Sequence, residues 1–306
     1  MKRRPILLIA NPDAGGKVGS GPDLDPDPAR LQPEALSAEL ARHGLDVRLH
    51  ELGQRDDAGR LARDAAASGH DVVVAGGDGT VGAVAAALLD EPDATLGILA
   101  RGSFNNIARG FGVPMTLDEA VDAIATGGTK SFDVGWIHHG DPADGRTFIE
   151  AAGVGVDAVG FLAIETAGRH GWARAIRALW LGLRRRRTRM RITLDGTTSR
   201  IVSPAVTIHN GPYHGPGMAV AVDADPADGW LNVATFSRMT SLEVLRHFVR
   251  VARRRPRREP RMRFHRARHI TVEGVRRALP AHADGVSIGA TPITAEVRPG
   301  ALRVFV

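Results

Sequence analysis

Short apolar runs alternate with amphipathic, alanine-rich stretches along the first part of the chain, up to Ala125. The apolar runs are rich in Val, Ile and Leu, which predicts buried strands at Ile6–Ala10, Val47–Leu49, Val72–Ala75 and Leu96–Leu99. The stretches between them repeat apolar residues at helical spacing, which predicts helices at Leu31–His43, Ala58–Ser68, Val81–Leu89, Ile107–Phe111 and Leu117–Ala125. Because strands that alternate with helices form βαβ units, we expect a parallel sheet covered by helices.

After Asp133 the pattern changes to short strands separated by turns rich in Asp, Gly and Pro. We expect strands at Trp136–His139, Thr147–Gly153, Met190–Leu194, Ile201–His209, Ala219–Val222, Leu231–Phe236, Ile270–Val275 and Ala295–Val297. Such spacing favours an antiparallel β-sandwich, here interrupted by two amphipathic stretches. Gly19–Pro28 has too much Pro, Gly and Asp for a strand or helix and is expected to be a mobile loop.

The length and composition of the chain restrict its class. Its 306 residues suit two domains, because single hydrophobic cores stop growing at roughly 250–300 residues. The cysteine count of zero excludes disulfides, a thiol nucleophile and a thiolate metal site. No apolar run is long enough to span a bilayer, and Ile6–Ala10 is too short for the core of a signal peptide. We therefore expect a cytoplasmic protein; the sequence does not indicate an oligomeric state.

The formal net charge of +6 arises from two arginine-rich segments. Residues 184–191 hold six arginines, and residues 246–268 hold eleven with one acid, Glu259. Amphipathic patterns accompany both segments, at Trp172–Leu183 and Leu242–Ala252, and basic amphipathic helices bind anionic membrane surfaces. We therefore favour peripheral contact with the inner face of a membrane; the alternative is a core-facing helix with a solvated arginine face. Nucleic acid is disfavoured as a partner, because the chain has a single Tyr to interleave with its basic residues.

The strongest local motif is a glycine-rich turn after the third expected strand, Gly76-Gly77-Asp78-Gly79-Thr80, which leads into a helix through Val81 and Gly82. Glycines let the backbone approach phosphate oxygens, and the free N–H groups of a helix N-terminus favour anions. A carboxylate in this turn is placed to hold a phosphate-bound Mg²⁺, directly or through water. The alternative is a structural turn in which Asp78 caps the helix.

Two further turns follow neighbouring expected strands. The first is Asn11-Pro12-Asp13-Ala14-Gly15-Gly16-Lys17, and the second is Gly102-Ser103-Phe104-Asn105-Asn106, with Arg109 one helical turn later. Open α/β sheets bind ligands at the carboxyl ends of their strands, so we expect the three turns to converge on one site. Ser103 and Asn105 can form hydrogen bonds to phosphate or ribose there, while Lys17 and Arg109 supply positive charge.

Together these residues resemble the diacylglycerol kinase catalytic-domain family, which includes bacterial lipid kinases and sphingosine kinases. The resemblance rests on the three turns and continues through Asn210–Met218, Ala227–Gly229, His282–Gly285, Thr291-Pro292 and Pro299–Val304. The matching motifs occur in the family's order from residue 11 to residue 304, so they cover nearly the whole chain.

The resemblance implies an N-terminal nucleotide-binding α/β domain at residues 1–133, joined by residues 297–306, and a lipid-binding β-sandwich at residues 134–296. It implies ATP and Mg²⁺ as cofactors and a lipid as acceptor. The implied nucleotide-site residues are Asn11, Pro12, Asp13, Ala14, Gly15, Lys17, Gly76, Gly77, Asp78, Gly79, Thr80, Val81, Gly82, Ser103 and Asn105. The implied catalytic residues are Asp78, Asp133, Arg109 and Asp284. A second, structural Mg²⁺ site would use Asp225, Asp228 and the carbonyl of Trp230.

The chain departs from the family pattern at three chemically important positions. Gly82 stands where the family usually has Asn, Asn106 where it has Asp, and Val286 where it has Glu. Since valine cannot accept a proton, an alternative is a catalytically impaired nucleotide- or lipid-binding protein on the same scaffold. A kinase for a soluble substrate, such as an NAD kinase, is a further alternative. The main prediction is a lipid kinase that phosphorylates a hydroxyl of a diacylglycerol-like lipid.

Overall fold

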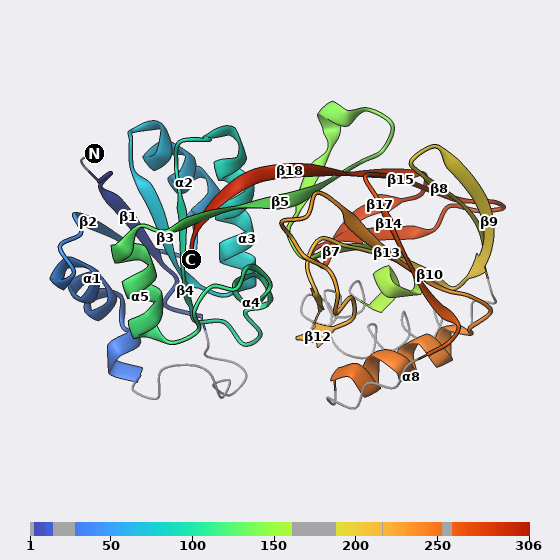
Figure 1. The fold of residues 1–306 in the computed structure, drawn as a ribbon, viewed down its shortest axis with the longest axis horizontal. Coiled ribbons are helices and arrows are strands. Elements are labelled where there is room, and N and C mark those ends of the chain that lie inside the picture. Colours follow the sequence, from blue (N-terminus) through green and yellow to red (C-terminus); the bar gives the residue numbers. More distant parts are fainter. Residues whose placement is uncertain (1–2, 15–27, 161–187, 216, 253–258) are drawn as a thin grey trace. The chain divides into compact units, whose positions relative to one another are not determined.

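The computed structural model describes residues 3–14, 28–160, 188–215, 217–252 and 259–306. The chain forms two compact units (Figure 1). The N-terminal unit comprises Met1–Asp133 with Gly300–Val306, and the C-terminal unit comprises Val134–Pro299. Two strands, β5 (Thr129–His138) and β18 (Ile293–Phe305), have residues in both units.

Four parallel strands form the sheet of the N-terminal unit, in the order β2-β1-β3-β4, and the end of β18 pairs in parallel with β4. Their bounds are β1 (Ile6–Ala10), β2 (Val47–Glu51), β3 (Asp71–Gly76) and β4 (Leu96–Ala100). Every residue of β1, β3 and β4 is buried, which explains why these strands are nearly continuous apolar runs. The carboxyl ends of these three neighbouring strands lie at one edge of the sheet.

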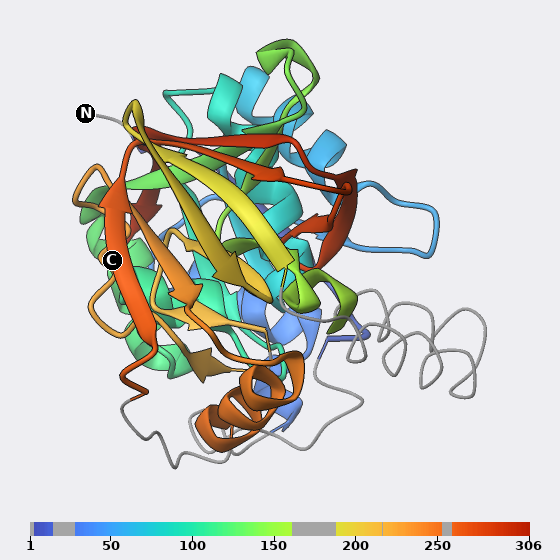
Figure 2. The ribbon, with the colours of Figure 1, turned by 90° about the vertical axis from the view of Figure 1, so that its right-hand side faces the viewer.

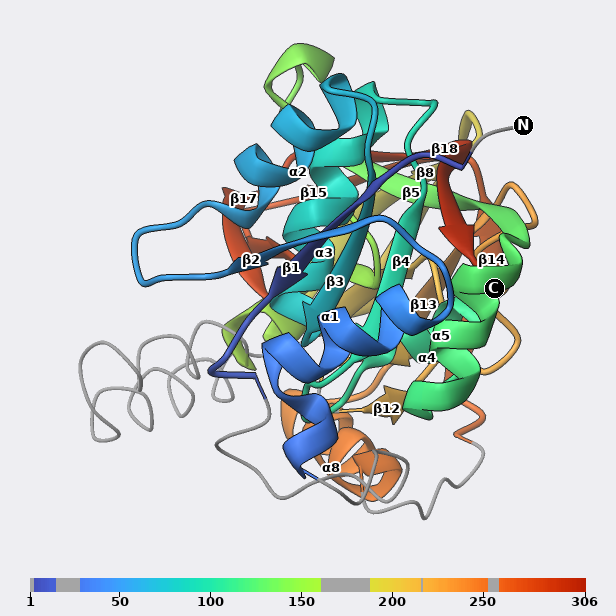
Figure 3. The same ribbon diagram turned by 90° about the vertical axis from the view of Figure 1, so that its left-hand side faces the viewer.

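Helices cover both faces of this sheet (Figure 3). They are η1 (Pro28–Leu31), α1 (Pro33–Arg42), α2 (Ala58–Ala67), α3 (Asp78–Ala87), η2 (Leu88–Asp90), α4 (Asn106–Phe111) and α5 (Leu117–Thr126). Helices α1 and α5 lie on one face, where Leu36, Leu40 and Val121 pack against side chains of the strands. Helices α2 and α3 contact each other on the opposite face. The expected α/β fold with a parallel sheet is confirmed.

The C-terminal unit is built from two antiparallel sheets (Figure 2). One has the order β14-β13-β10-β7-β16-β17, and the other contains β18-β15-β8-β9. The strands are β6 (Arg146–Phe148), β7 (Ala151–Gly155), β8 (Thr188–Leu194), β9 (Thr197–Ser203), β10 (Ala205–His209), β11 (Tyr213–His214), β12 (Met218–Ala219), β13 (Leu231–Phe236), β14 (Met262–Ala267), β15 (His269–Gly274), β16 (Pro280–Ala283) and β17 (Val286–Ala290), and a short helix, η3, spans Pro142–Asp144. Ile208 and Val233 from the first sheet share a core with Met190, Ile192 and Ile270 from the second. The expected antiparallel sandwich is therefore confirmed.

Helix α8 (Ser241–Ala252) covers the outer face of the six-stranded sheet. Val244 and Phe248 pack against Phe236, whose side chain lies on the face away from the sandwich core. A capping box begins the helix: the Thr240 N–H donates to the Glu243 carboxylate at 2.7 Å, and the Glu243 N–H donates to the Thr240 hydroxyl at 3.3 Å.

Some expected strand bounds were wrong. At Ala219–Val222 the strand ends after Ala219, and the N–H groups of Val220 and Ala221 donate to the Pro212 carbonyl in a turn. Ile201–His209 is divided into β9 and β10 at Pro204, which has no N–H to donate to a neighbouring strand.

Thr147–Gly153 is likewise divided, into β6 and β7. The arginine-rich segment 246–268, for which no strand was expected, contains β14. Residues 19–27 and the amphipathic stretch Trp172–Leu183 lie outside the described residues.

Candidate active site

The three turns predicted from the sequence meet at the carboxyl ends of β1, β3 and β4. The side-chain amide of Asn11 donates a hydrogen bond to the Thr80 hydroxyl at 3.0 Å, which joins the first turn to the second. The Arg101 guanidinium donates to the Asn11 carbonyl at 3.4 Å, which joins the first turn to the third. The structure therefore brings the three turns together, as the strand order predicts.

Two glycines allow the second and third turns to touch. A Cβ atom built on Gly102 would lie 2.5 Å from the Cα of Gly77, which is shorter than any normal carbon–carbon contact. It would also lie 2.8 Å from Oδ1 of Asn105. Asn105 adopts a left-handed conformation with φ of 51°, and its side-chain oxygen accepts a hydrogen bond from the Gly102 N–H at 2.7 Å. Asn105 thus fixes the shape of the third turn from within.

Asp78 is the first residue of α3, and its carboxylate reaches the start of α4. Its Oδ1 accepts a hydrogen bond from the Ile107 N–H at 3.0 Å. Burial raises the pKa of Asp78, while the backbone N–H groups of Ile107, Asn106 and Asn105 act in the opposite direction. A buried carboxylate of this kind favours a nearby cation. The capping role considered from the sequence is thus real, but Asp78 caps α4 rather than its own helix.

The other predicted positions of this region have different environments. Pro12 and Asp13 are exposed, and Ala14, Ser103 and Arg109 are half-buried. The Arg109 Nε–H donates to the Phe104 carbonyl at 3.1 Å.

Val81 is buried, and a Cβ on Gly82 would make only an ordinary contact with Ile107, at 3.7 Å. Gly79 is open, with no atom within 4 Å of such a Cβ. Gly15 and Lys17 lie outside the described residues.

Asp133 lies on β5, away from the three turns in sequence, and is 3% exposed. Its Oδ1 accepts a hydrogen bond from the Gly300 N–H at 2.8 Å. Arg101, which the sequence analysis did not single out, is 8% exposed beside the turns, and burial lowers its pKa from a high ordinary value. The sequence did offer a signal for Arg101, because this residue directly precedes the Gly102 turn.

In the C-terminal unit, Asp284 lies in the two-residue turn between β16 and β17. Asp284 and Gly285 have φ values of 45° and 77°, as in a type I′ hairpin. The Asp284 carboxylate accepts three hydrogen bonds, from the N–H groups of Ile149 at 2.6 Å and of Glu150 and Ala151 at 3.0 Å each. Val286, at the start of β17, is 47% exposed.

The proposed second metal site lies in the turn before β13. Asp225 accepts a hydrogen bond from the Ala227 N–H, and Asp228 accepts one from the Trp230 N–H, both at 3.0 Å. Arg266 forms an ion pair with the other oxygen of Asp228 at 2.5 Å. This arginine already supplies positive charge to Asp228, so a metal ion would have to displace Arg266 or bind Asp228 beside it. The second metal site stays a prediction.

Comparison with known proteins identifies both units. Residues 5–137 match the family model of the diacylglycerol kinase catalytic domain, and residues 155–306 match that of the YegS C-terminal NAD kinase beta sandwich-like domain. The chain belongs to the diacylglycerol kinase catalytic-domain family. Its domain composition is that of lipid kinases, which are phosphotransferases.

Individual relatives agree with this family. A diacylglycerol kinase of Mycobacterium tuberculosis is 29% identical over 278 residues, which cover 88% of this chain and 87% of the relative. A crystal structure described as a diacylglycerol kinase from Bacillus anthracis has a TM-score of 0.69 at 21% identity and covers 100% of this chain and 97% of its own. Yeast NADH kinase shares the fold, with a TM-score of 0.52, 12% identity, and coverage of 99% and 83%.

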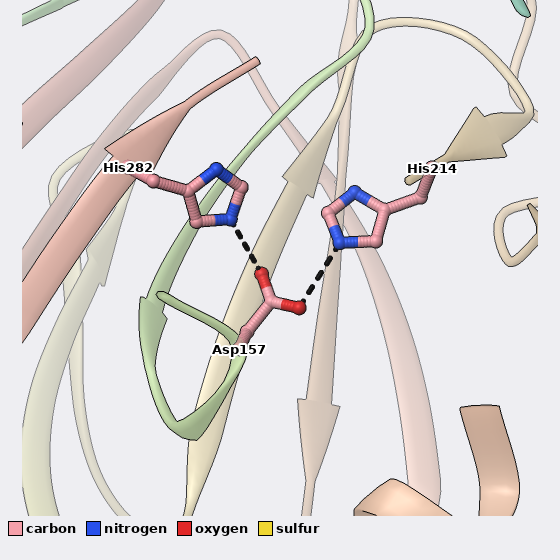
Figure 4. A group of neighbouring side chains, drawn as sticks. All are labelled: Asp157, His214 and His282. Carbon is pink, nitrogen blue, oxygen red and sulfur yellow. Dashed lines mark hydrogen bonds and ion pairs between the residues drawn. The ribbon is translucent and has the colours of Figure 1, made fainter. Parts of the chain in front are cut away.

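A buried polar cluster that the sequence did not reveal lies in the C-terminal unit of this family member (Figure 4). Asp157 accepts hydrogen bonds from Nε2 of His214 at 3.0 Å and from Nε2 of His282 at 2.8 Å. All three residues are almost fully buried. They are far apart in the sequence and meet through the pairing of β7 with β16 and through the segment around β11. The one available signal was a single acid, Asp157, within the apolar segment 151–158.

Proposed function

We propose that this chain is an ATP- and Mg²⁺-dependent lipid kinase that phosphorylates a hydroxyl of a diacylglycerol-like lipid. The observation that carries the proposal is the convergence of the Asn11, Gly77 and Gly102 turns, with Asp78 between them, in a chain whose two units both match lipid-kinase domains. Phosphoryl transfer depends mainly on positioning and charge neutralisation, which are the properties that such a set of turns provides.

The nucleotide phosphates would bind at the three turns. Gly79 is uncrowded, so its backbone can approach a phosphate oxygen, and the free N–H groups at the start of α3 favour an anion. Arg101 and Arg109 supply positive charge to the same region. Asn11, Ser103 and Thr80 offer amide and hydroxyl groups for the remaining hydrogen bonds.

We expect Asp78 and Asp133 to be the residues that hold a magnesium ion. Asp78 and Asp133 provide hard carboxylate oxygens, which Mg²⁺ prefers, and the raised pKa of buried Asp78 indicates a site that gains from a cation. When bound there, the ion would neutralise negative charge on the phosphate oxygens. Asn106 follows Asn105 where the family usually has Asp, so one carboxylate fewer is available for this role.

Asp284 is the proposed acceptor-side group. The acceptor hydroxyl oxygen attacks the γ-phosphorus of ATP, the bond from that phosphorus to the β–γ bridging oxygen breaks, and the hydroxyl proton must leave. A carboxylate within hydrogen-bond reach of that hydroxyl orients it and takes its proton. Three backbone N–H groups hold Asp284 in one place for this task. Val286 adds no proton acceptor.

Access to a lipid substrate would come from binding at a membrane surface. None of the helices in the described part of the chain is long and apolar enough to span a bilayer. The exposed face of α8 carries Leu242, Arg246, Val249 and Arg250, a mixture of apolar and basic residues that suits the headgroup region of an anionic membrane.

The experiment that tests the proposed function measures transfer of label from [γ-³²P]ATP with Mg²⁺ to diacylglycerol in anionic vesicles. We expect label in the lipid with the wild type and a loss of roughly 10³-fold or more with Asp78→Asn, because charge neutralisation at the phosphates carries most of the catalysis. Asp90→Asn is the matched control, since Asp90 is an exposed acid of the same unit.

A Val286→Glu variant measured in the same assay distinguishes the alternatives. Label with the wild type supports an active kinase, and label only with Val286→Glu indicates a binding protein on a kinase scaffold. Equal activity of wild type and Asp78→Asn contradicts the proposed role of Asp78. Label in NAD without vesicles would indicate a kinase for a soluble substrate.

A further inference from the structure

The buried cluster of Asp157, His214 and His282 lies two residues from the proposed acceptor-side carboxylate. His282 is on β16 directly before the Asp284–Gly285 turn, and its ring uses both nitrogens. Nε2 lies 2.8 Å from the Asp157 carboxylate, and Nδ1 lies 3.2 Å from the backbone nitrogen of Gly285. The ring therefore connects a buried carboxylate to the backbone of the turn.

These two contacts determine the proton positions on His282. The backbone nitrogen of Gly285 can only donate, so Nδ1 must be the acceptor and carry no proton. A neutral imidazole then has its proton on Nε2, which donates to the Asp157 carboxylate. The interaction with ionised Asp157 stabilises this tautomer, and only this tautomer can accept the Gly285 hydrogen bond.

The same argument excludes His282 as a metal ligand in this conformation, although the cluster has the composition of a metal site. A metal at Nε2 would require the ring proton on Nδ1, where it would face the Gly285 N–H. Two donors would then oppose each other. The distances of 2.8 Å and 3.0 Å from the two histidines to separate oxygens of Asp157 are those of hydrogen bonds.

The Asp157 carboxylate is kept ionised by its partners. Burial acts to raise the pKa of Asp157, but its contacts with His214 and His282 outweigh burial, so the pKa lies below its ordinary value. An ionised carboxylate is the strongest acceptor available to fix the His282 ring.

The turn that His282 contacts is conformationally demanding. Asp284 has φ of 45°, a left-handed conformation that Gly, and less often Asn or Asp, adopts and that other residues avoid. The register of β16 against β17 shifts by one residue between Ala281 and His282, and such bulges re-aim side chains. The Gly285–His282 hydrogen bond is one of the contacts that hold this turn in place.

The Asp157–His282 contact requires glycine at position 153 on β7. A Cβ built on Gly153 would lie 1.9 Å from Oδ2 of Asp157 and 2.5 Å from Nε2 of His282. Any side chain at position 153 would therefore occupy the space in which these two atoms meet. A substitution at Gly153 therefore disturbs the Asp157–His282 contact without changing either of these two side chains.

We propose that His282, fixed in its Nε2–H tautomer by Asp157, is a positioning residue that holds the Asp284–Gly285 turn so that the Asp284 carboxylate stays aimed at the acceptor hydroxyl. The proposal rests on the proposed kinase function. It assigns Asp157 and His282 an indirect role, since neither contacts the reacting atoms.

Two conservative variants separate the two hydrogen bonds of the ring. The side-chain oxygen of His282→Asn occupies the place of Nδ1 and can accept from Gly285, but it cannot reach Asp157. The side-chain amide of His282→Gln reaches Asp157, but it offers no acceptor to Gly285. We expect His282→Ala and His282→Gln to lower kcat by about 10²-fold. His282→Asn should restore most of the rate, and the KM for ATP should stay unchanged throughout.

Gly153→Ala supplies an independent test, with Gly160→Ala as its control, since a Cβ at Gly160 meets no atom within 4 Å. We expect Gly153→Ala to lower kcat as His282→Gln does, and Gly160→Ala to leave it unchanged. A wild-type kcat for His282→Ala, or rescue by Gln and not by Asn, would overturn the proposal.

A readout that needs no activity separates this proposal from the kinase assignment. Long-range ¹H–¹⁵N correlation spectra of the wild type should show the His282 proton on Nε2 at neutral pH. Exchange of the Gly285 amide should accelerate in His282→Gln and not in His282→Asn. A proton on Nδ1 overturns the positioning role even if lipid is phosphorylated. If no lipid is phosphorylated but both spectroscopic results hold, the kinase proposal fails and the turn contact stands.

Discussion

At the scale of single residues, the nucleotide side of the site depends on positions where no side chain fits. Gly77 and Gly102 come from different turns and lie in backbone contact, so that a Cβ on either would meet backbone atoms of the other. Gly79 is different, because a Cβ on it would meet open space. These glycines therefore have two distinct roles, close packing at Gly77 and Gly102 and accessibility at Gly79.

Alanine substitutions should separate the two roles. Gly102→Ala forces a Cβ to 2.5 Å from the Cα of Gly77, and we expect it to destabilise the protein by about 1–3 kcal/mol and to weaken ATP binding. Gly79→Ala should leave the melting temperature unchanged and weaken ATP binding, because its methyl group meets the phosphates rather than the protein. Thermal unfolding and calorimetric titration with ATP measure both quantities. Equal melting temperatures for the two variants would contradict this distinction.

At the scale of secondary structure elements, the parallel strands were predicted well and the arginine-rich segment was not. In β3 the residues Val72–Ala75 form a continuous apolar run, and such a run cannot be mistaken for a loop. Strand β14 is an edge strand whose residues Arg263, Phe264 and His265 are exposed, so it lacks the apolar alternation by which strands are predicted.

Helix α8 was predicted from its period, and the structure shows what its two faces do. Val244 and Phe248 are used in the core, whereas Leu242 and Val249 are 45% and 41% exposed. Arg246 and Arg250 share the exposed face. This mixture of apolar and basic residues is the reason for proposing membrane-surface contact, with a solvated arginine face as the alternative.

Reversing the charge of this face should weaken membrane binding. We expect Arg246→Glu combined with Arg250→Glu to lower affinity for anionic vesicles roughly tenfold or more, since each arginine contributes about 1 kcal/mol near such a surface. Arg200→Glu with Arg276→Glu changes the net charge equally at exposed strand and turn positions and should have little effect. Vesicle sedimentation at low and high salt measures the difference, which should shrink as salt screens it. Equal loss in both double variants would indicate a general charge effect.

At the scale of the whole molecule, the two units differ in how far the sequence predicts them. The convergence of the three turns follows from chain order, because successive βα units place the carboxyl ends of their strands at one edge. The Asp157 cluster could not be found this way, since its members lie at positions 157, 214 and 282 and are brought together by the pairing of β7 with β16 and by the placement of the segment around β11. Local patterns predict elements, whereas long-range pairing in a sandwich is determined by packing that no short segment contains.

The chain passes between its units twice, at Asp133–Val134 on β5 and at Pro299–Gly300 on β18, and these two strands pair with each other. A side-chain hydrogen bond adds to this pairing. Oδ1 of buried Asp133 accepts this bond from the Gly300 N–H at 2.8 Å. Asp133 is therefore expected to have a structural role in addition to the metal-binding role proposed for it. A single substitution cannot distinguish the two roles, because removing the side chain abolishes both.

Two substitutions at Asp133 should separate structure from charge. Asp133→Asn keeps an oxygen that can accept from Gly300 and removes the negative charge, so we expect a nearly unchanged melting temperature with weaker Mg²⁺-dependent ATP binding. Asp133→Ala leaves the Gly300 N–H without its acceptor and should cost about 1–3 kcal/mol of stability in addition. Thermal unfolding with calorimetry at varied Mg²⁺ measures both effects. If Asn and Ala destabilise the protein equally, the hydrogen bond from Gly300 does not contribute the expected stability. If neither alters Mg²⁺ dependence, Asp133 does not serve the metal.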